Sequence, residues 1–192
     1  MNTPAHLLIG AAVFGKRDQR RLVWAALLGS LLPDLSLYLL AGGAMYLFAI
    51  PPARVFNELY FSDAWQTIFA VDNSFLVWGV LLALALWWRS GWCLALTAAA
   101  ILHLALDFPL HHDDGRAHFW PLSGWIFASP VSYWDIEHGA RWIAPVEATA
   151  AVIAALRLWA WRPGRRLSVL VLILLSAEIW IVRQWLFYFI DS

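Results

Sequence analysis

The sequence predicts an all-α fold: a polytopic transmembrane helical bundle with about 5–6 membrane segments, one of them kinked or broken at Pro33. Hydrophobic residues make up 62% of the chain and charged residues only 14%, whereas roughly a quarter of the residues of a soluble domain are charged. The apolar residues also gather into several long runs, each able to cross about 30 Å of hydrocarbon. A soluble helical domain can hide one such run, but hardly several.

The first predicted element is a short helix that begins at Thr3-Pro4 and runs to about Phe14. Asn2 or Thr3 can cap this helix, and proline is favoured at the first helical position. Its length suits a tilted or partial crossing of the membrane. A basic loop follows at residues 16–21.

The second apolar run, residues 22–48, carries a single charge, Asp34, directly after Pro33. Because proline removes a helical hydrogen bond, we expect a kink or a break at that point. Residues 51–72 mix prolines and acidic residues with aromatic ones, so we expect them outside the membrane.

Two further spans are predicted at about residues 73–89 and 91–107. A long polar segment follows at residues 108–138, and the last two spans flank the basic residues 162–166. No repeat or linker divides the chain. We therefore expect a single transmembrane domain, residues 1–192, with an extracytoplasmic His/Asp-rich segment at 108–138.

The distribution of basic residues predicts an orientation. Residues 16–21 hold four Lys and Arg residues and residues 162–166 hold three, whereas 51–72 holds one. We therefore expect both basic loops in the cytoplasm and the segment at 108–138 on the periplasmic side of an inner membrane. Trp120, Trp125, Tyr133 and Trp134 in that segment suit an interfacial aromatic belt.

Composition also weighs against several kinds of protein. The net charge is zero, so there is no electrostatic case for binding nucleic acid. Cys93 is the only cysteine and cannot form an internal disulfide. The N-terminal residues lack the basic region of a signal peptide, and we expect them to belong to the mature fold.

Five of the six histidines lie between His103 and His138. His103 and Asp107 are four residues apart, so on a helix they lie on one face and can bind one ion together. More imidazole and carboxylate groups follow closely, at His111, His112, Asp113, Asp114 and His118. These groups are ligands for zinc, and also for iron or manganese. The cluster therefore predicts a metal or catalytic site.

A plainer interpretation exists for the same residues. A histidine and an aspartate four residues apart can bond to each other or cap a helix end, and the loop histidines can be solvated. Polar groups at membrane depth are costly and usually functional, however, which favours a site around His103, Asp107 and Asp34. Weaker candidates are the other polar residues of the spans, namely Glu147, Glu178 and Arg183. Arg157 is expected to extend its charge to the membrane surface.

At these residues the chain resembles the bacterial membrane-bound metal-dependent hydrolase family, which is distantly similar to zinc-dependent phospholipase C. The family has a histidine just before a short apolar helix, matched here by His6. Its Leu-Pro-Asp motif is matched at Asp34, and its His-x-x-x-Asp helix at His103 and Asp107. The resemblance covers roughly residues 1–115.

The chain departs from the family pattern at three points. Ser36 stands where a second acidic residue is expected, and Asn73-Ser74 occupies the place of an expected His-Ser. No histidine lies between His6 and His103, so the central histidine pair is missing. Either the residues that follow position 110 rebuild the site, or catalysis is lost.

The resemblance implies a membrane-embedded metal-dependent hydrolase in the bacterial inner membrane, acting on a phosphoester of a lipid or lipid-linked substrate. The expected ligands of a divalent ion, with zinc favoured, are His6, Asp34, His103, Asp107 and His118. The expected catalytic residues are His111, His112, Asp113, Asp114 and Arg116, the last to neutralise phosphate charge. The alternative is a non-enzymatic membrane protein with a structural or transport-related metal or proton site.

Overall fold

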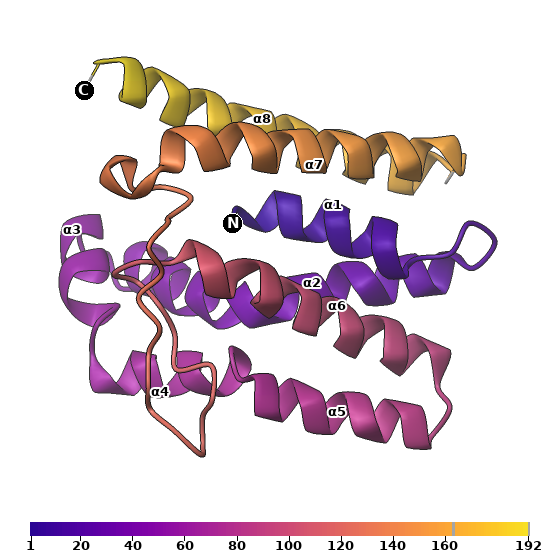
Figure 1. Ribbon diagram of the computed structural model, residues 1–192, viewed down its shortest axis with the longest axis horizontal. Coiled ribbons are helices and arrows are strands. Elements are labelled where there is room, and N and C mark those ends of the chain that lie inside the picture. The colour runs from indigo at the N-terminus through magenta and orange to yellow at the C-terminus, as the bar shows by residue number, and fades with distance from the viewer. Residues whose placement is uncertain (163, 192) are drawn as a thin grey trace.

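The computed structural model describes residues 1–162 and 164–191, with side chains up to Gln184. This part of the chain is built from helices and contains no strand (Figure 1). Five helical segments in it are long and apolar enough to cross a membrane: Arg20–Leu47, Asp63–Trp87, Gly91–Leu110, Ala140–Ala160 and Arg165–Gln184. The prediction of an all-α, multi-pass membrane bundle is confirmed.

The first helix, α1 (Thr3–Phe14), begins with Asn2 at its N-cap and Pro4 in its first turn, close to the sequence-based prediction. Its 12 residues span roughly 18 Å at 1.5 Å per residue, which is too short for a full crossing. It packs against α2 (Arg20–Gly42), and its N-terminus lies partway along the bundle (Figure 1).

The second helix, α2, is continuous through Pro33 and ends in a π-helical turn, η1 (Gly43–Leu47). The helix is therefore not broken at the proline. Because proline has no N–H, the carbonyl of Gly29 loses its helical donor. The carbonyl of Ser30, the next residue, accepts the Nδ1–H of His103 from another helix.

The stretch expected to lie outside the membrane is helical for most of its length. It contains α3 (Pro52–Arg54), a π-helical turn η2 (Val55–Leu59) and α4 (Asp63–Asp72). Only Asn73 and Ser74 separate α4 from α5 (Phe75–Trp87), and the two helices together form one candidate span. Residues 63–72 are thus helical and part of a candidate span, whereas the sequence led us to expect them outside the membrane.

The second half of the chain has the predicted order of elements. The helix α6 (Gly91–Asp107) is followed by a short 3-10 turn, η3 (Phe108–Leu110), and by an irregular polar segment that ends in η4 (Ile136–His138). Two long helices complete the fold, α7 (Ala140–Ala160) and α8 (Arg165–Asp191). Pro163, in the predicted basic loop between them, lies outside the described residues.

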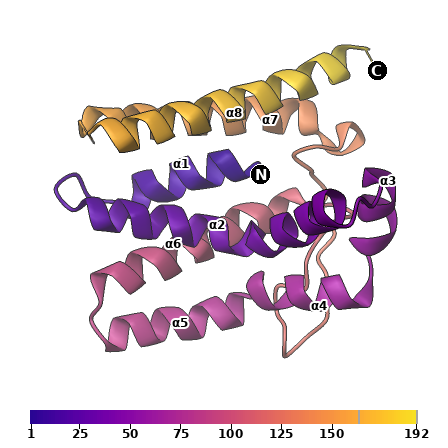
Figure 2. The same ribbon diagram turned by 180° about the vertical axis from the view of Figure 1, so that it is seen from behind.

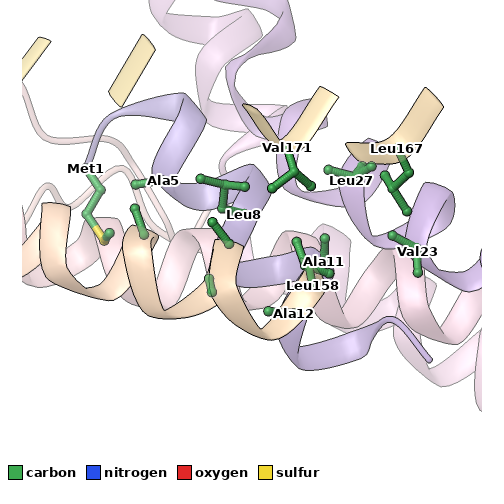
Figure 3. Close-up of a cluster of buried hydrophobic side chains, with 13 residues drawn as sticks. Met1, Ala5, Leu8, Ala11, Ala12, Val23, Leu27, Leu158, Leu167 and Val171 are labelled. Carbon is green, nitrogen blue, oxygen red and sulfur yellow. The ribbon is translucent and has the colours of Figure 1, made fainter. Parts of the chain in front are cut away.

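Small side chains allow the helices to pack closely, as is typical of membrane proteins. Alanines of α1 pack with Leu158 and Val171 in a core shared by α1, α2, α7 and α8 (Figure 3). At Gly29 of α2, a Cβ atom would meet the carbonyl oxygen of Leu96 in α6 at 2.0 Å. At Gly10 of α1, it would meet the hydroxyl of Ser30 at 1.9 Å. The glycines therefore fix how closely α1, α2 and α6 approach.

The connections between helices lie at the two ends of the bundle, and the basic connections all lie at the same end (Figure 1 and Figure 2). The loop at residues 16–21, the turn at Arg89 and the α7–α8 connection lie at one end. The helix α3 and the polar segment at 108–138 lie at the other. All the basic loops therefore share one side, as a single orientation in a membrane requires.

Candidate metal centre

Three buried side chains from α1 and α6 form a compact donor group: His6, His103 and Asp107. One ligand-type atom from each lies within 4.8 Å of those of the other two. The two imidazole rings stack with their centroids 3.7 Å apart, and His6 Nε2 lies 2.8 Å from Asp107 Oδ1. The His-x-x-x-Asp spacing of α6 thus places both of its side chains against the histidine of α1.

The orientation of His103 is fixed by a backbone carbonyl of α2. Its Nδ1–H donates to the carbonyl of Ser30 at 2.8 Å, so in the neutral ring Nε2 carries the lone pair. This Nε2 atom is buried and has no hydrogen-bond partner among the described residues. It lies 3.2 Å from Asp107 Oδ2 and 3.6 Å from Asp34 Oδ1. A lone pair that faces two carboxylates needs a positive group between them, which a divalent cation or a proton supplies.

Asp34 joins this group from α2, directly after Pro33. Its second carboxylate oxygen accepts a hydrogen bond from the hydroxyl of Thr3 at the start of α1. Asp107 also accepts a hydrogen bond from the amino group of Met1, at 2.5 Å. The structure therefore brings His6, Asp34, His103 and Asp107 together from three helices.

Asp34 and Asp107 face a pocket of about 160 Å³, which we call the polar pocket. The first residues of the chain form part of its wall, because α1 begins partway along the bundle. Its other polar lining residues are Tyr38, Tyr60, Asn73, His111, Asp114, Arg116, His118 and Tyr133. Carboxylate, imidazole, guanidinium and phenol groups thus meet in one small space.

His111 and Asp114 form a hydrogen-bonded pair in the wall of the polar pocket. His111 Nδ1 donates to Asp114 Oδ1 at 2.8 Å, and His111 Nε2 lies 3.6 Å from Asp107 Oδ2. Burial lowers the pKa of His111, but the carboxylates of Asp107 and Asp114 outweigh burial and raise this pKa to about 9. Burial likewise opposes ionisation of Asp114, yet the bond from His111 holds the pKa of Asp114 below its ordinary value.

Arg116 places its guanidinium on aromatic rings beside the pocket. Its central carbon lies 4.7 Å from the ring centroid of Tyr60 and 4.3 Å from that of Phe69. One of its terminal nitrogens, Nη1, is buried and has no hydrogen-bond partner among the described residues. A guanidinium with one buried, unused donor is suited to receive an anion.

His118 enters the pocket from the irregular segment and contacts the backbone of Asn73. Its Nδ1–H donates to the Asn73 carbonyl at 2.8 Å, and the Asn73 side chain donates to the carbonyl of Pro33. Burial lowers the pKa of His118, which favours the neutral ring. The polar segment thus supplies an imidazole beside Asn73, where the resemblance expects a histidine. His118 does not belong to the compact donor group.

Two predicted catalytic residues lie away from the polar pocket. His112 donates to the carbonyl of Ser129 and stacks on His138, with ring centroids 3.5 Å apart. Asp113 is exposed and lines a wider groove instead. Neighbouring residues of an irregular segment face different ways, so the structure assigns His111 and Asp114 to the pocket and leaves these two outside it.

Two buried acids of the long C-terminal helices contact the start of α1. Glu147 of α7 accepts the backbone N–H of Asn2, and Glu178 of α8 accepts a hydrogen bond from the side chain of Asn2 at 3.4 Å. Each of these carboxylates has a second buried oxygen with no partner among the described residues. They border the donor group without joining it.

Several pocket residues are absent from the sequence-based prediction. Tyr133 was assigned to an aromatic belt, but it lines the pocket and meets the ring of His111 edge-on at 5.2 Å. Burial and the carboxylates of Asp107 and Asp114 hold the pKa of Tyr133 well above its ordinary value, so its phenol stays a donor. Tyr60 and Tyr38 were also missed. Only Asn73 had a sequence signal, as the residue at the place of an expected histidine.

The fold and this site define an all-α, multi-pass membrane protein with a buried His/Asp group that could hold a metal ion. Comparisons with protein-family models, with curated proteins and with solved structures found no match.

Proposed function

We propose that the protein is a membrane-embedded, metal-dependent hydrolase that cleaves a phosphoester of a lipid or lipid-linked substrate. The observation that carries this proposal is the orientation of the donor group. His103 Nε2 is buried, lacks a hydrogen-bond partner and points at two carboxylates, and those carboxylates line a pocket that also holds Arg116.

His6, His103 and Asp107 would hold the divalent ion, with Asp34 beside them, and zinc is the proposed metal. A divalent ion in such a site activates water as a nucleophile and polarises a phosphoryl oxygen. The hydrogen bond from His103 Nδ1 to the Ser30 carbonyl fixes the ring as a ligand, as partners of this kind do in metal proteins.

The remaining pocket residues have distinct roles in this proposal. His111, hydrogen-bonded to Asp114, moves a proton at its Nε2 atom during hydrolysis. Arg116 binds the phosphoryl oxygens through its unused Nη1 donor. His118, whose Nδ1 is occupied by Asn73, presents its other nitrogen for a substrate oxygen or an additional ligand. His118 and His111 would thus replace the central histidines that the chain lacks.

The geometry favours an enzyme over a structural metal site. Structural zinc sites are usually closed by four protein ligands, whereas catalytic ones have three and keep an open position. Here the compact group has three donors, and one of them, Asp107, faces the polar pocket. A transport role is disfavoured because the other half of the described bundle is filled with apolar side chains, including Ala12, Val23 and Leu158.

We further propose that the protein resides in a bacterial inner membrane with the polar pocket toward the periplasm. This orientation rests on the basic loops, which lie at the end of the bundle opposite the polar segment at 108–138 (Figure 1). Lipid of the outer leaflet would then be the source of substrate.

Release of a phosphorylated headgroup from a phospholipid, or of inorganic phosphate from a lipid phosphate, tests the proposed activity. The protein is reconstituted in nanodiscs with candidate phospholipids and lipid phosphates, with added zinc or with a chelator. We expect hydrolysis that needs the metal, is abolished in Asp107→Asn and is retained in Arg157→Ala, an exposed residue remote from the pocket. No metal-dependent hydrolysis of any phosphoester lipid would overturn the proposal.

A further inference from the structure

Beside the polar pocket lies a second, larger hollow of about 830 Å³, which we call the aromatic groove. Several residues line both the polar pocket and the aromatic groove, among them Leu37, Tyr60, Tyr133 and Ile181. The two hollows are therefore adjacent, the first small and rich in polar groups, the second larger and mostly apolar.

The polar pocket and the aromatic groove differ in volume, so they suit different parts of a ligand. The polar pocket, at about 160 Å³, is close to the roughly 150 Å³ of a cavity that holds a single benzene molecule. It has room for a phosphate-sized group but not for a whole lipid. The groove, at about 830 Å³, lies within the roughly 300–1,000 Å³ of typical ligand sites.

Two candidate membrane spans border the groove. Leu37 comes from α2 and Ile181 from α8, and both helices are candidate spans. Their neighbours Leu39 and Trp180 are 66% and 58% exposed on the outside of the bundle. The groove is thus bordered by two candidate spans, whose outer faces would contact the hydrocarbon chains of the surrounding lipid.

The side chains of the polar pocket and of the aromatic groove are complementary to an anionic amphiphile, a molecule with a charged head and an apolar chain. In the polar pocket, Arg116 offers a buried, unused donor. In the aromatic groove, Phe56, Phe61 and Trp134 supply aromatic surface, and Phe56 and Phe61 are exposed although nothing in the described chain covers them. A soluble phosphate would leave this surface uncovered, whereas a neutral lipid would leave the buried Nη1 of Arg116 without an anionic partner.

We propose that the aromatic groove binds the hydrocarbon chain of a membrane lipid whose phosphate-bearing headgroup occupies the polar pocket. The identity of the headgroup rests on the function proposed above. The position of the chain does not, because it follows from the shape and lining of the groove.

Photo-crosslinking tests where the chain lies. The probe is a single-chain lipid phosphomonoester with a diazirine in its chain, added to protein in phosphatidylcholine vesicles and mapped by mass spectrometry. We expect label on the 56–61 segment, on Trp134 and on Ile181. Leu37→Trp and Ile181→Trp each place a larger ring beside the groove and should remove this label. Val80→Trp, on an exposed face of α5, is the matched control and should leave the label in place.

A neutral probe with the same chain but no phosphate tests the headgroup. Its label in the groove should be weaker by about tenfold or more, because a hydrogen bond between charged groups is lost. Arg116→Gln should reduce the label from the phosphate probe to a similar extent. Equal labelling by both probes would contradict recognition of phosphate. Label on lipid-facing residues such as Val80 alone would overturn the groove as the chain site.

A separate assay distinguishes failure of this inference from failure of the hydrolase proposal. Crosslinking needs no turnover, so a labelled groove without any hydrolysis would support chain binding and contradict the enzyme. In the opposite case, hydrolysis of a soluble phosphoester that has no hydrocarbon chain shows whether the chain matters for the reaction. If this soluble phosphoester were hydrolysed as fast as the lipid, and Leu37→Trp had no effect on either, the hydrolase would stand and the groove inference would fall.

Discussion

The two ring nitrogens of His103 have different neighbours, and this difference is the most informative detail of the site. Nδ1 is tied to the backbone of α2, and Nε2 faces Asp34 and Asp107. The pairing of His103 with Asp107 could be predicted from sequence because an i, i+4 contact is local to a helix. The approach of His6 and Asp34 depends on how three helices pack, so only the family resemblance indicated it.

The polar segment shows where residue-level prediction fails. His111 and His112 are adjacent in the chain and chemically identical, yet only His111 faces the polar pocket. In a helix or strand, periodicity would have separated them, but an irregular segment has no period. The sequence could identify the cluster of histidines and aspartates, but not which of them line the polar pocket.

A paired substitution tests this assignment. His111→Ala should lower the rate of phosphoester hydrolysis by about 100- to 10,000-fold, the usual contribution of a positioned acid or base. His112→Ala should leave the rate nearly unchanged, because His112 stacks on His138 outside the pocket. Steady-state rates on the same lipid substrate provide the measurement. Equal losses in both variants would contradict the placement of the two side chains.

At the scale of the helices, the contact between α2 and α6 positions Asp34 against His103 and Asp107. The contact is close because Gly29 has no side chain to separate the two backbones. Alternation of apolar runs and turn residues was enough to predict most of the helices. It placed α4 outside the membrane, however, because two aspartates and nearby prolines obscured its apolar face.

Substitution of Gly29 by alanine should destabilise the bundle. The added Cβ would meet the Leu96 carbonyl at 2.0 Å, and crowding of this kind costs about 1–3 kcal/mol. Thermal unfolding in detergent micelles measures the loss. Gly79→Ala in α5 is the control, because a Cβ there has nothing within 4 Å and alanine favours the helix by up to about 1 kcal/mol. If Gly29→Ala were as stable as this control, the close contact would be wrong.

The orientation of the helices in the membrane can be tested with cysteines placed in the loops that connect them. In a Cys93→Ser background, Ser123→Cys in the polar segment should react with a membrane-impermeant maleimide in intact cells. Asp18→Cys in the first basic loop should react only after the inner face is opened. Both positions are exposed in the structure. The reverse pattern would place the polar pocket on the cytoplasmic side and overturn the proposed localisation.

For the molecule as a whole, a short first helix creates the space in which the site lies. Because α1 starts partway along the bundle, its first residues line the polar pocket instead of filling it. Residues of the polar segment line that space, and the aromatic groove lies beside it, bordered by Leu37 of α2 and Ile181 of α8. Composition and hydropathy predicted the membrane bundle reliably, since lipid imposes long apolar runs. They could not predict the pocket, which arises only when distant segments meet.

The central claim is that His6, His103 and Asp107 hold a divalent metal, and the metal content of the purified protein tests it most directly. Wild-type protein, purified without chelator and analysed by inductively coupled plasma mass spectrometry, should contain a stoichiometric transition metal, with zinc proposed. Asp107→Asn and His103→Ala should each lose that metal while still inserting into the membrane, because an incomplete set of ligands binds weakly. Arg157→Ala, whose side chain is exposed near Trp161, should keep it. Wild-type protein free of stoichiometric metal would contradict the metal centre and, with it, the proposed hydrolase.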